Sequence, residues 1–418
     1  MMEPSESILT AMLAHIDQHI QQHHISLERM SDDAIATLFT QLIEQRMGGH
    51  SGAADLVQQV LDQMLGFGPI SPLLRDNSIS EIMINGYERV FVESAGQVRQ
   101  IPSEFTDDHA LRQVIDRMLH PLGKRVDESS PMVDGRLPCG SRINIIIPPL
   151  AVSGATVTIR KFNQQQWDLS DLVALKSMSS EVAQMLQWAV QHKQNIVLSG
   201  GTGSGKTTLL NALAQSISSQ TRVISIEDAA ELLLPLQHWV RLESRPANQE
   251  GIGAISIRQL VMNALRMRPD RIIIGECRGG EALDMLQAMN TGHAGSMTTL
   301  HANSPRDALQ RLETMVLMAG FELPIAAIRQ QIRSAIQFVV QIERTGDGVR
   351  RVTCVTEITG MIGDVIQTSE IVCYQPRQNR YEFSGEMPNF AKELNLEQRQ
   401  QLQRMLAIED AREPCDVA

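Results

Sequence analysis

Aromatic residues, basic residues, cysteines and long apolar runs are all scarce in this chain. Phe, Trp and Tyr make up 4% of its 418 residues, and 37 Lys and Arg stand against 48 Asp and Glu, which gives a net charge of −11. Nucleic-acid binding draws much of its affinity from clustered basic residues, and single strands are commonly held by stacked aromatic rings. The composition therefore disfavours a nucleic-acid partner, although a local basic stripe stays compatible with it.

The cysteines and the lengths of the apolar runs indicate in which cellular compartment the protein works. The cysteines are scattered and form no CxxC pair, so we expect neither a disulfide framework nor a structural zinc site. The longest apolar runs, such as residues 145–150, fall far short of the roughly 20 residues of a membrane-spanning helix. The amino-terminal segment is acidic and lacks the basic lead of a secretory signal. We expect a cytosolic protein. The five cysteines are Cys139, Cys277, Cys354, Cys373 and Cys415.

Hydrophobic periodicity divides the chain into four parts. Residues 1–65 carry apolar positions at helical spacing and predict a small module of three helices. Residues 66–165 mix strand-like and helical patterns, as in an α+β domain, and the glutamines at 164–166 make a plausible linker. Residues 170–390 alternate strands with helices, which predicts a mostly parallel sheet covered on both faces. Residues 391–418 are interpreted as a helical tail.

Three histidines in the first module, His15, His19 and His23, are spaced by four residues. This spacing places them on one face of a helix, where they could bind a metal. A polar flank beside the apolar stripe is the more ordinary interpretation, and both remain open.

A glycine-rich segment at residues 200–207 carries the strongest chemical signal. It matches GxxxxGK[ST], follows a predicted strand and opens a predicted helix, which is the context of a phosphate-binding P-loop. Its backbone N–H groups and the helix N-terminus favour phosphate, while Lys206 is expected at the β- and γ-phosphates and Thr207 at Mg²⁺. We therefore predict a nucleotide site. Its residues are Gly200, Gly201, Thr202, Gly203, Ser204, Gly205, Lys206, Thr207 and Thr208.

A carboxylate at the end of another strand is expected to serve the metal. Residues 272–274 are three isoleucines, followed by Gly275 and Glu276. Ligands of open α/β sheets bind beyond the carboxyl ends of the strands, so we assign Glu276 to the Mg²⁺ site together with Thr207. A helix cap formed by residues 277–280 is the alternative.

Between these segments lies a third one, Glu227-Asp228-Ala229-Ala230-Glu231, also at a predicted strand end. One aligned carboxylate is enough to activate the attacking water in phosphoryl transfer. Glu227 is our first choice as base, with Asp228 and Glu231 as supports, and the pattern alone does not decide among the three carboxylates. A solvated acidic loop is the plainer interpretation.

Two histidines flank the predicted strand 297–300. His301, at its carboxyl end, is positioned to contact a γ-phosphate, whereas His293 precedes the strand. A zinc site is the rival, but no cysteine or third histidine accompanies the pair at ligand spacing.

These four motifs together resemble the secretion-ATPase superfamily, the motors of type II secretion, type IV secretion and type IV pili. Within it the sequence is most similar to CpaF-type Tad/Flp pilus-assembly ATPases. The likeness extends over about residues 66–390. It is carried by the P-loop and by the segments 125–127, 136–138, 140–144, 147–150, 158–162, 266–270 and 279–285.

The resemblance implies a RecA-like P-loop ATPase domain preceded by the α+β domain, and a homohexamer working with polytopic inner-membrane platform proteins. It also implies that Arg142 and Arg160 of the α+β domain approach the γ-phosphate, as an arginine finger does. The sequence departs from the pattern of the superfamily at two points. Many relatives carry an acidic residue where this chain has Ala294, and the tetracysteine module of the type II branch is absent from the sequence.

We therefore expect a cytosolic ATPase, peripheral to the inner membrane, that powers Tad/Flp-type pilus assembly or protein secretion. A type IV secretion ATPase is the first alternative. A DNA-translocating motor and a nucleotide-dependent scaffold that does not hydrolyse ATP are the others. The scaffold is disfavoured because Lys206, Glu227 and Glu276 are all present.

Overall fold

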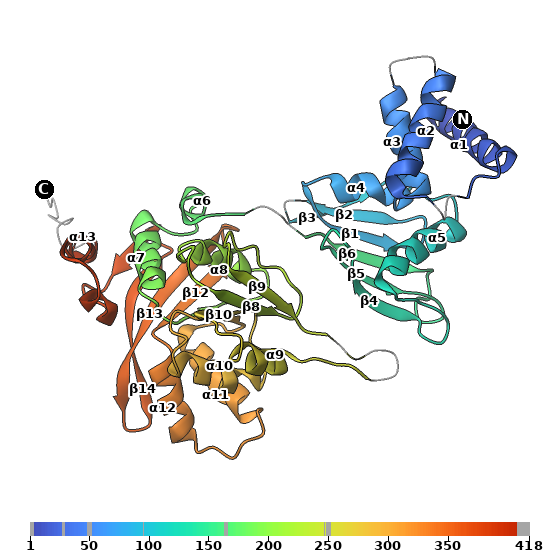
Figure 1. Cartoon of the computed structure of the whole chain (residues 1–418). Helices are drawn as coiled ribbons and strands as arrows, with labels where there is room; N and C mark the ends of the chain where they lie inside the picture. Colours follow the sequence, from blue (N-terminus) through green and yellow to red (C-terminus); the bar gives the residue numbers. More distant parts are fainter. Residues whose placement is uncertain are drawn as a thin grey trace, which may run out of the picture. The chain divides into compact units, whose positions relative to one another are not determined.

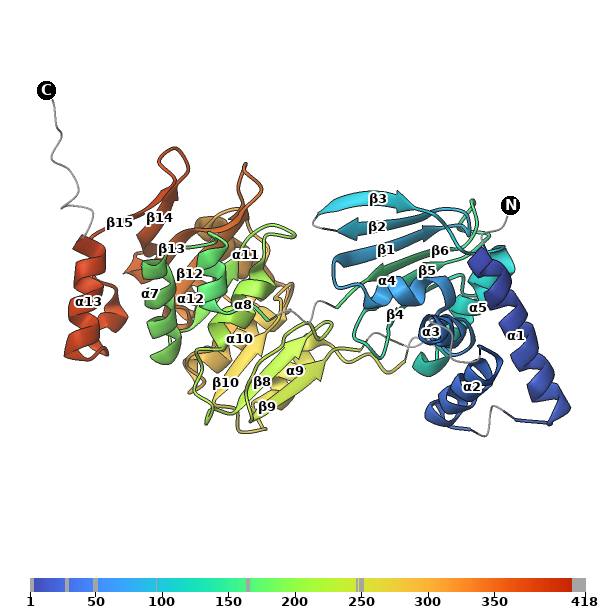
Figure 2. The same cartoon turned by 90° about the horizontal axis from the view of Figure 1, so that it is seen from above.

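The computed structural model describes residues 4–26, 30–47, 52–94, 96–162, 166–245, 247 and 252–407. The chain forms two compact units, Met1–Asn163 and Gln164–Ala418 (Figures 1 and 2). In the described segments, no helix combines the length and apolar character needed to cross a bilayer.

The first unit begins with the three predicted helices, α1 (Pro4–Gln22), α2 (Asp32–Met47) and α3 (Ala53–Met64). Their apolar positions meet in one small core, in which Ile16, Phe39 and Val60 are fully buried. The helical spacing in the sequence thus corresponds to a shared apolar face.

An antiparallel sheet with strand order β3-β2-β1-β6-β5-β4 forms the rest of the first unit. Helix α5 (Asp108–Leu119) packs Leu111, Val114, Ile115 and Met118 against one face of it. Short helices η2 (Gly68–Ile70), α4 (Ser71–Arg75) and η3 (His120–Leu122) complete the unit. The strands are β1 (Ile79–Asn85), β2 (Val90–Ser94), β3 (Gln97–Ile101), β4 (Met132–Arg136), β5 (Arg142–Ile146) and β6 (Thr156–Arg160).

The second unit is built on a nine-stranded sheet of order β15-β14-β13-β12-β7-β11-β10-β8-β9. The strands from β12 to β9 in this order run parallel, as the alternating pattern predicts. They are β7 (Ile196–Ser199), β8 (Val223–Glu227), β9 (Trp239–Glu243), β10 (Arg271–Ile274), β11 (Met297–Leu300) and β12 (Phe338–Arg344).

Two apolar cores cover the two faces of this sheet, because successive strand residues point to opposite sides. Ile196 and Leu198 enter one core and Val197 the other. Figure 1 shows α7 and α8 on one side and the group α9–α12 on the other. The helices are α6 (Leu169–Ala174), α7 (Ser180–Gln191), α8 (Lys206–Ala214), α9 (Ile257–Ala264), α10 (Glu281–Asn290), α11 (Pro305–Leu317) and α12 (Ile325–Ala335).

The end of the sheet beyond β12 is antiparallel, which the periodicity analysis did not anticipate. It consists of β13 (Arg350–Ile362), β14 (Val365–Gln375) and β15 (Arg380–Phe383). Helices η4 (Asn389–Lys392) and α13 (Leu396–Ala407) follow, and residues 408–418 of the proposed tail lie outside the described residues.

Candidate active site

The four sequence motifs of the second unit meet at the carboxyl edge of the parallel strands. The P-loop follows β7, His301 follows β11, Glu276 follows β10, and Glu227 ends β8. These strands are neighbours in the order β7-β11-β10-β8. Segments up to about 100 residues apart in sequence therefore supply adjacent side chains, at the edge where open α/β sheets bind ligands.

The P-loop folds tightly around its glycines. An added Cβ at Gly200 would lie 2.2 Å from the Ile342 carbonyl oxygen of β12, so no larger residue fits at that point. Gly205 has a φ of 101°, a conformation that side chains strongly disfavour, and caps the start of α8. The loop is therefore held against β12, with the N-terminus of α8 available to an anion.

Lys206, the first residue of α8, is 8% exposed and folds back over the loop. Its Nζ donates to the carbonyl oxygens of Gly200 at 3.0 Å and Gly201 at 2.7 Å. Burial lowers the pKa of Lys206, and the charge of Glu276 opposes that change. The ammonium is thus satisfied by weak acceptors that a phosphate oxygen can replace.

His301 connects this lysine to the next strand end. Its Nδ1 lies 3.3 Å from Lys206 Nζ, and its Nε2 lies 2.9 Å from Glu276 Oε1. An ammonium group can only donate, so Nδ1 accepts and the proton of the neutral ring resides on Nε2. Burial, followed by the charge of Lys206, lowers the pKa of His301, which favours this neutral form.

The contact series continues from Glu276 through an arginine that the sequence analysis did not select. Arg278 Nη2 donates to Glu276 Oε2 at 2.6 Å, and Arg278 Nη1 lies 3.5 Å from Asp228 Oδ2. Burial alone would raise the pKa of Glu276, but the hydrogen bond and charge of Arg278 lower it below its usual value. Glu276 is therefore ionised at neutral pH.

Glu227 occupies a different environment at the end of β8. It is 3% exposed, and its Oε2 accepts backbone N–H groups of Glu231 at 2.6 Å and Leu232 at 2.8 Å. Its Oε1 is buried without a hydrogen-bond partner. Burial raises the pKa of Glu227 to about 7, and the two N–H groups limit the increase. An added Cβ at Gly275 would lie 2.9 Å from Glu227 Cγ, so the glycine before Glu276 makes room for this carboxylate.

The two carboxylates are thus separated in basicity by their surroundings, a pattern that commonly distinguishes a base from a charged partner. A carboxylate that titrates near pH 7 is suited to general-base catalysis. A carboxylate that remains ionised is suited to a cation. Asp228, by contrast, is exposed and paired with Ser244 and Arg278.

Three further histidines that were named from the sequence belong to other parts of the fold. His293 precedes β11 and contacts the Ala288 carbonyl oxygen at 3.2 Å, at the amino edge of the sheet and therefore away from the P-loop. The rings of His19 and His23 lie 4.3 Å apart in the first unit.

Two arginines near the motifs escaped the sequence analysis. Arg350, at the start of β13, donates to the Gly203 carbonyl oxygen at 3.0 Å. A separation of 147 residues between these partners leaves no local signal in the sequence. Arg278 has such a signal, because it follows a strand-end glutamate by two residues, but the same segment also suits a helix cap.

Arg142 and Arg160 belong to the first unit, on adjacent strands. They are direct partners across β5 and β6, while Arg136 faces Arg142 across β4 and Glu81 faces Arg160 across β1. Residues that pair across strands share a face, and this face is opposite to the core under α5. Arg160 pairs with Glu81 at 3.6 Å. Like charges directly opposite in a sheet are destabilising, so a row of three arginines has a structural cost.

The donors at the carboxyl edge fit ATP and Mg²⁺. The P-loop offers backbone N–H groups and a lysine to phosphates, while Thr207 and Glu276 offer the oxygen ligands that Mg²⁺ prefers. The buried, unpaired Oε1 of Glu227 also matches a polar ligand at this edge. When bound, Mg²⁺ neutralises phosphate charge.

Comparisons with known proteins identify the family of the chain. The family described as "Type II/IV secretion system protein" matches residues 63–383. A protein of Mycobacterium tuberculosis (strain ATCC 25618 / H37Rv) that is named for conjugal transfer is 36% identical over 295 residues, or 69% of this chain and 83% of that protein. The type IV secretion system protein PtlH of Bordetella pertussis is 35% identical over 308 residues, or 68% of this chain and 91% of PtlH.

A solved structure supports the fold class. The Legionella pneumophila ATPase DotB is similar with a TM-score of 0.50 at 20% identity, over 80% of this chain and 85% of DotB. The predicted α/β class, with a RecA-like domain preceded by an α+β domain and helices, is confirmed. Because the family match spans most of the sequence and two relatives exceed 30% identity over two thirds of it, the chain belongs to the type II/IV secretion system protein family, within the secretion-ATPase superfamily.

Proposed function

We propose that this chain hydrolyses ATP to ADP and phosphate at the carboxyl edge of its second unit, and that hydrolysis powers Tad/Flp-type pilus assembly or protein export. The observation that carries the hydrolytic part is the series of contacts from Lys206 through His301 to Glu276, beside the separately buried Glu227. In this proposal the protein works in the cytoplasm against an inner-membrane platform.

Each residue has a distinct role in the proposed reaction. Lys206 exchanges the loop carbonyls for β- and γ-phosphate oxygens, and the P-loop N–H groups orient the phosphates. Glu227 accepts a proton from the attacking water at its unpaired Oε1. Glu276 and Thr207 would hold Mg²⁺, and the neutral ring of His301 lies between Lys206 Nζ and Glu276 Oε1.

Two observations bear on which process the ATPase drives, and they favour different processes. The resemblance of the N-terminal strand segments supports Tad/Flp-type pilus assembly. The names of the relatives, conjugal transfer and type IV secretion, favour the type IV secretion alternative. A DNA-translocating motor is a third candidate, disfavoured by the net charge of −11 and the few aromatic residues.

ATP turnover measured with and without DNA, together with assays of surface pili in cells that lack the chain, separates these functions. Pilus assembly predicts turnover that DNA does not stimulate, and loss of pili that is restored by the wild-type chain but not by the Lys206→Ala variant. Stimulation by DNA would favour the translocation motor instead. Intact pili with a loss of exported protein would favour type IV secretion.

Assembly into a hexamer is expected when nucleotide is bound. A motor that brings arginines of one domain over a phosphate held by another gains from a closed ring, and the resemblance implies six chains. Light scattering of the full chain with a non-hydrolysable ATP analogue should give about six times the 46.4 kDa of one chain. A strict monomer at micromolar concentration with the analogue bound would contradict the ring.

Arg142 and Arg160 are proposed to recognise the γ-phosphate. Arginine presents a planar fork of donors that suits phosphate oxygens, so Arg142→Ala and Arg160→Ala should each reduce turnover about 10²-fold. Affinity for ATP should fall while affinity for ADP, which lacks the γ-phosphate, changes little.

Arg99→Ala is the matched control, because Arg99 lies on the exposed strand β3 of the same sheet. It should leave turnover near the wild-type value. If the two arginines only stabilise the sheet, both variants will lose ATP and ADP affinity equally and melt at lower temperature.

A further inference from the structure

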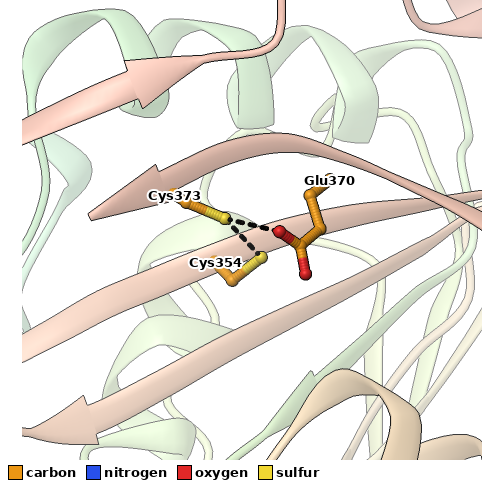
Figure 3. Close-up of side chains that lie close together, drawn as sticks. All are labelled: Cys354, Glu370 and Cys373. Atoms are coloured by element: carbon orange, nitrogen blue, oxygen red, sulfur yellow. Dashed lines mark hydrogen bonds between the residues drawn. The ribbon is translucent and has the colours of Figure 1, made fainter. Parts of the chain in front are cut away.

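Two cysteines that are far apart in sequence meet across the β13–β14 hairpin. Cys354 of β13 and Cys373 of β14 are direct cross-strand partners, and their Sγ atoms lie 3.1 Å apart. Glu370 Oε2 lies 3.3 Å from Cys373 Sγ. Figure 3 shows the three side chains converging, and their donor atoms all lie within 4.8 Å of one another. The scattered cysteine positions in the sequence conceal this cluster.

A β-bulge brings the carboxylate to the sulfur atoms. Residues three apart on a regular strand point to opposite faces, so Glu370 and Cys373 would ordinarily be separated. Here Val355 pairs with Val372 and Thr356 with Glu370, which leaves Ile371 as the extra residue of the bulge. Bulges commonly re-aim a side chain, and this one places Glu370 on the face of both cysteines.

The cluster is poor in compensating positive charge. Cys354 Sγ lies within hydrogen-bond distance of Cys373 Sγ, which in turn lies within hydrogen-bond distance of Glu370 Oε2. Among the described residues, the other polar group recorded within hydrogen-bond distance of Cys354 Sγ is the Thr356 hydroxyl, at 3.3 Å. A divalent cation would offset the negative charge that these donors gather.

We propose that Cys354, Cys373 and Glu370 form a binding site for a thiophilic divalent cation, with Zn²⁺ as the best match. Tetrahedral Zn²⁺ with sulfur ligands at about 2.3 Å and oxygen at about 2.1 Å places its donor atoms roughly 3.6–3.8 Å apart. The observed separations of 3.1 and 3.3 Å reach that range through small side-chain rotations. Water completes the fourth position, and the exposed Glu370 provides an entry route. The bound cation clamps β13 to β14.

A disulfide is the competing chemistry for such a pair. The carboxylate argues against it, because Glu370 lies 3.3 Å from the Cys373 sulfur and a disulfide has no use for a third ligand. Three converging donors of two kinds are instead the minimum for an open zinc site.

Titration of the reduced, metal-free full chain with Co²⁺, followed by displacement with Zn²⁺, tests the site. Co²⁺ bound by thiolates gives a sulfur-to-metal charge-transfer band that histidine or carboxylate sites do not produce. We expect one equivalent with this band, bleached by Zn²⁺. Cys354→Ser and Cys373→Ser should abolish the band, and Glu370→Gln should weaken Zn²⁺ affinity about tenfold or more while both thiols remain. Cys139→Ser, at an exposed cysteine outside the cluster, is the matched control and should bind as the wild type does.

Four outcomes would overturn the proposal. The first is the absence of a thiolate band in the reduced wild type, and the second is an unchanged band in the Cys354→Ser, Cys373→Ser double variant. The third is wild-type Zn²⁺ affinity in Glu370→Gln. The mass of the chain can also be measured after equilibration with glutathione at the ratio of reduced to oxidised form found in the cytosol. A mass two hydrogens lower than that of the reduced chain, with no metal retained, would show that the two cysteines form a disulfide. Melting curves of each variant without metal separate loss of binding from loss of fold.

Discussion

Replacement of Lys206 by alanine is expected to reduce ATP turnover by a factor of about 10³ or more, which corresponds to ~4 kcal/mol of transition-state stabilisation. The side chain is the cation of the P-loop, and its present acceptors are loop carbonyl oxygens. Steady-state phosphate release by the purified full chain measures the effect. The melting temperature should change little, because alanine is a good helix former at the start of α8.

The control is Lys176→Ala, which removes an exposed lysine from the loop after α6 and should leave turnover near the wild-type value. Retention of more than about a tenth of wild-type turnover in Lys206→Ala would exclude the P-loop lysine from the mechanism, since tenfold is only ~1.4 kcal/mol.

Replacement of Glu227 by glutamine should reduce turnover about 10²-fold or more while ATP binding persists. Glutamine keeps an oxygen for the Glu231 and Leu232 N–H groups but cannot accept a proton from water. In the wild type, kcat/KM should rise with pH through about 7, as the carboxylate becomes ionised, and this rise should disappear in the variant.

Stability should respond to the same substitution in a defined pH window. The pKa of Glu227 in the folded chain is about 7, against 4.5 for the ordinary carboxyl, so its protonated form stabilises the fold below pH 4.5. That contribution is lost as pH rises through 7, by up to roughly 3 kcal/mol at about 1.4 kcal/mol per pH unit. Glu227→Gln carries no such titration, so its melting temperature relative to the wild type should increase between pH 4.5 and 8.

Glu357→Gln is the matched control for both measurements. Glu357 is 4% exposed, and burial also raises its pKa, but it lies on β13 and accepts a hydrogen bond from the Asn389 N–H. It should reproduce the direction of the stability change and keep turnover. If Glu227→Gln retains turnover, the base is another group, and Asp228 and Glu231 are the next to test.

The spacing of apolar residues along the sequence was sufficient to predict the parallel strands of the second unit and the helices between them. Runs such as Ile272-Ile273-Ile274 are uniformly apolar because both faces of β10 are buried, and the helices between the strands carry their own apolar spacing. The positions of Lys206, Glu227, Glu276 and His301 at one edge follow from parallel strands, whose carboxyl ends coincide.

The remaining features depend on long-range pairing. The hairpin of β13 and β14 contains two bulges, so its residues do not keep the simple alternation that marks a strand in sequence. For the same reason the convergence of Cys354, Cys373 and Glu370 has no local signature. The pKa of Glu227 likewise depends on its burial and on hydrogen bonds from the Glu231 and Leu232 N–H groups, which no local pattern shows.

The identity of the nucleotide bound after incubation with ATP and Mg²⁺ tests the central claim, that this edge of the sheet hydrolyses ATP, most directly. The wild-type chain, rapidly separated from free nucleotide, should carry ADP, the Glu227→Gln variant should carry intact ATP, and the Lys206→Ala variant should carry little of either. Intact ATP on the wild type, or ADP formed on Glu227→Gln as fast as on the wild type, would contradict the account.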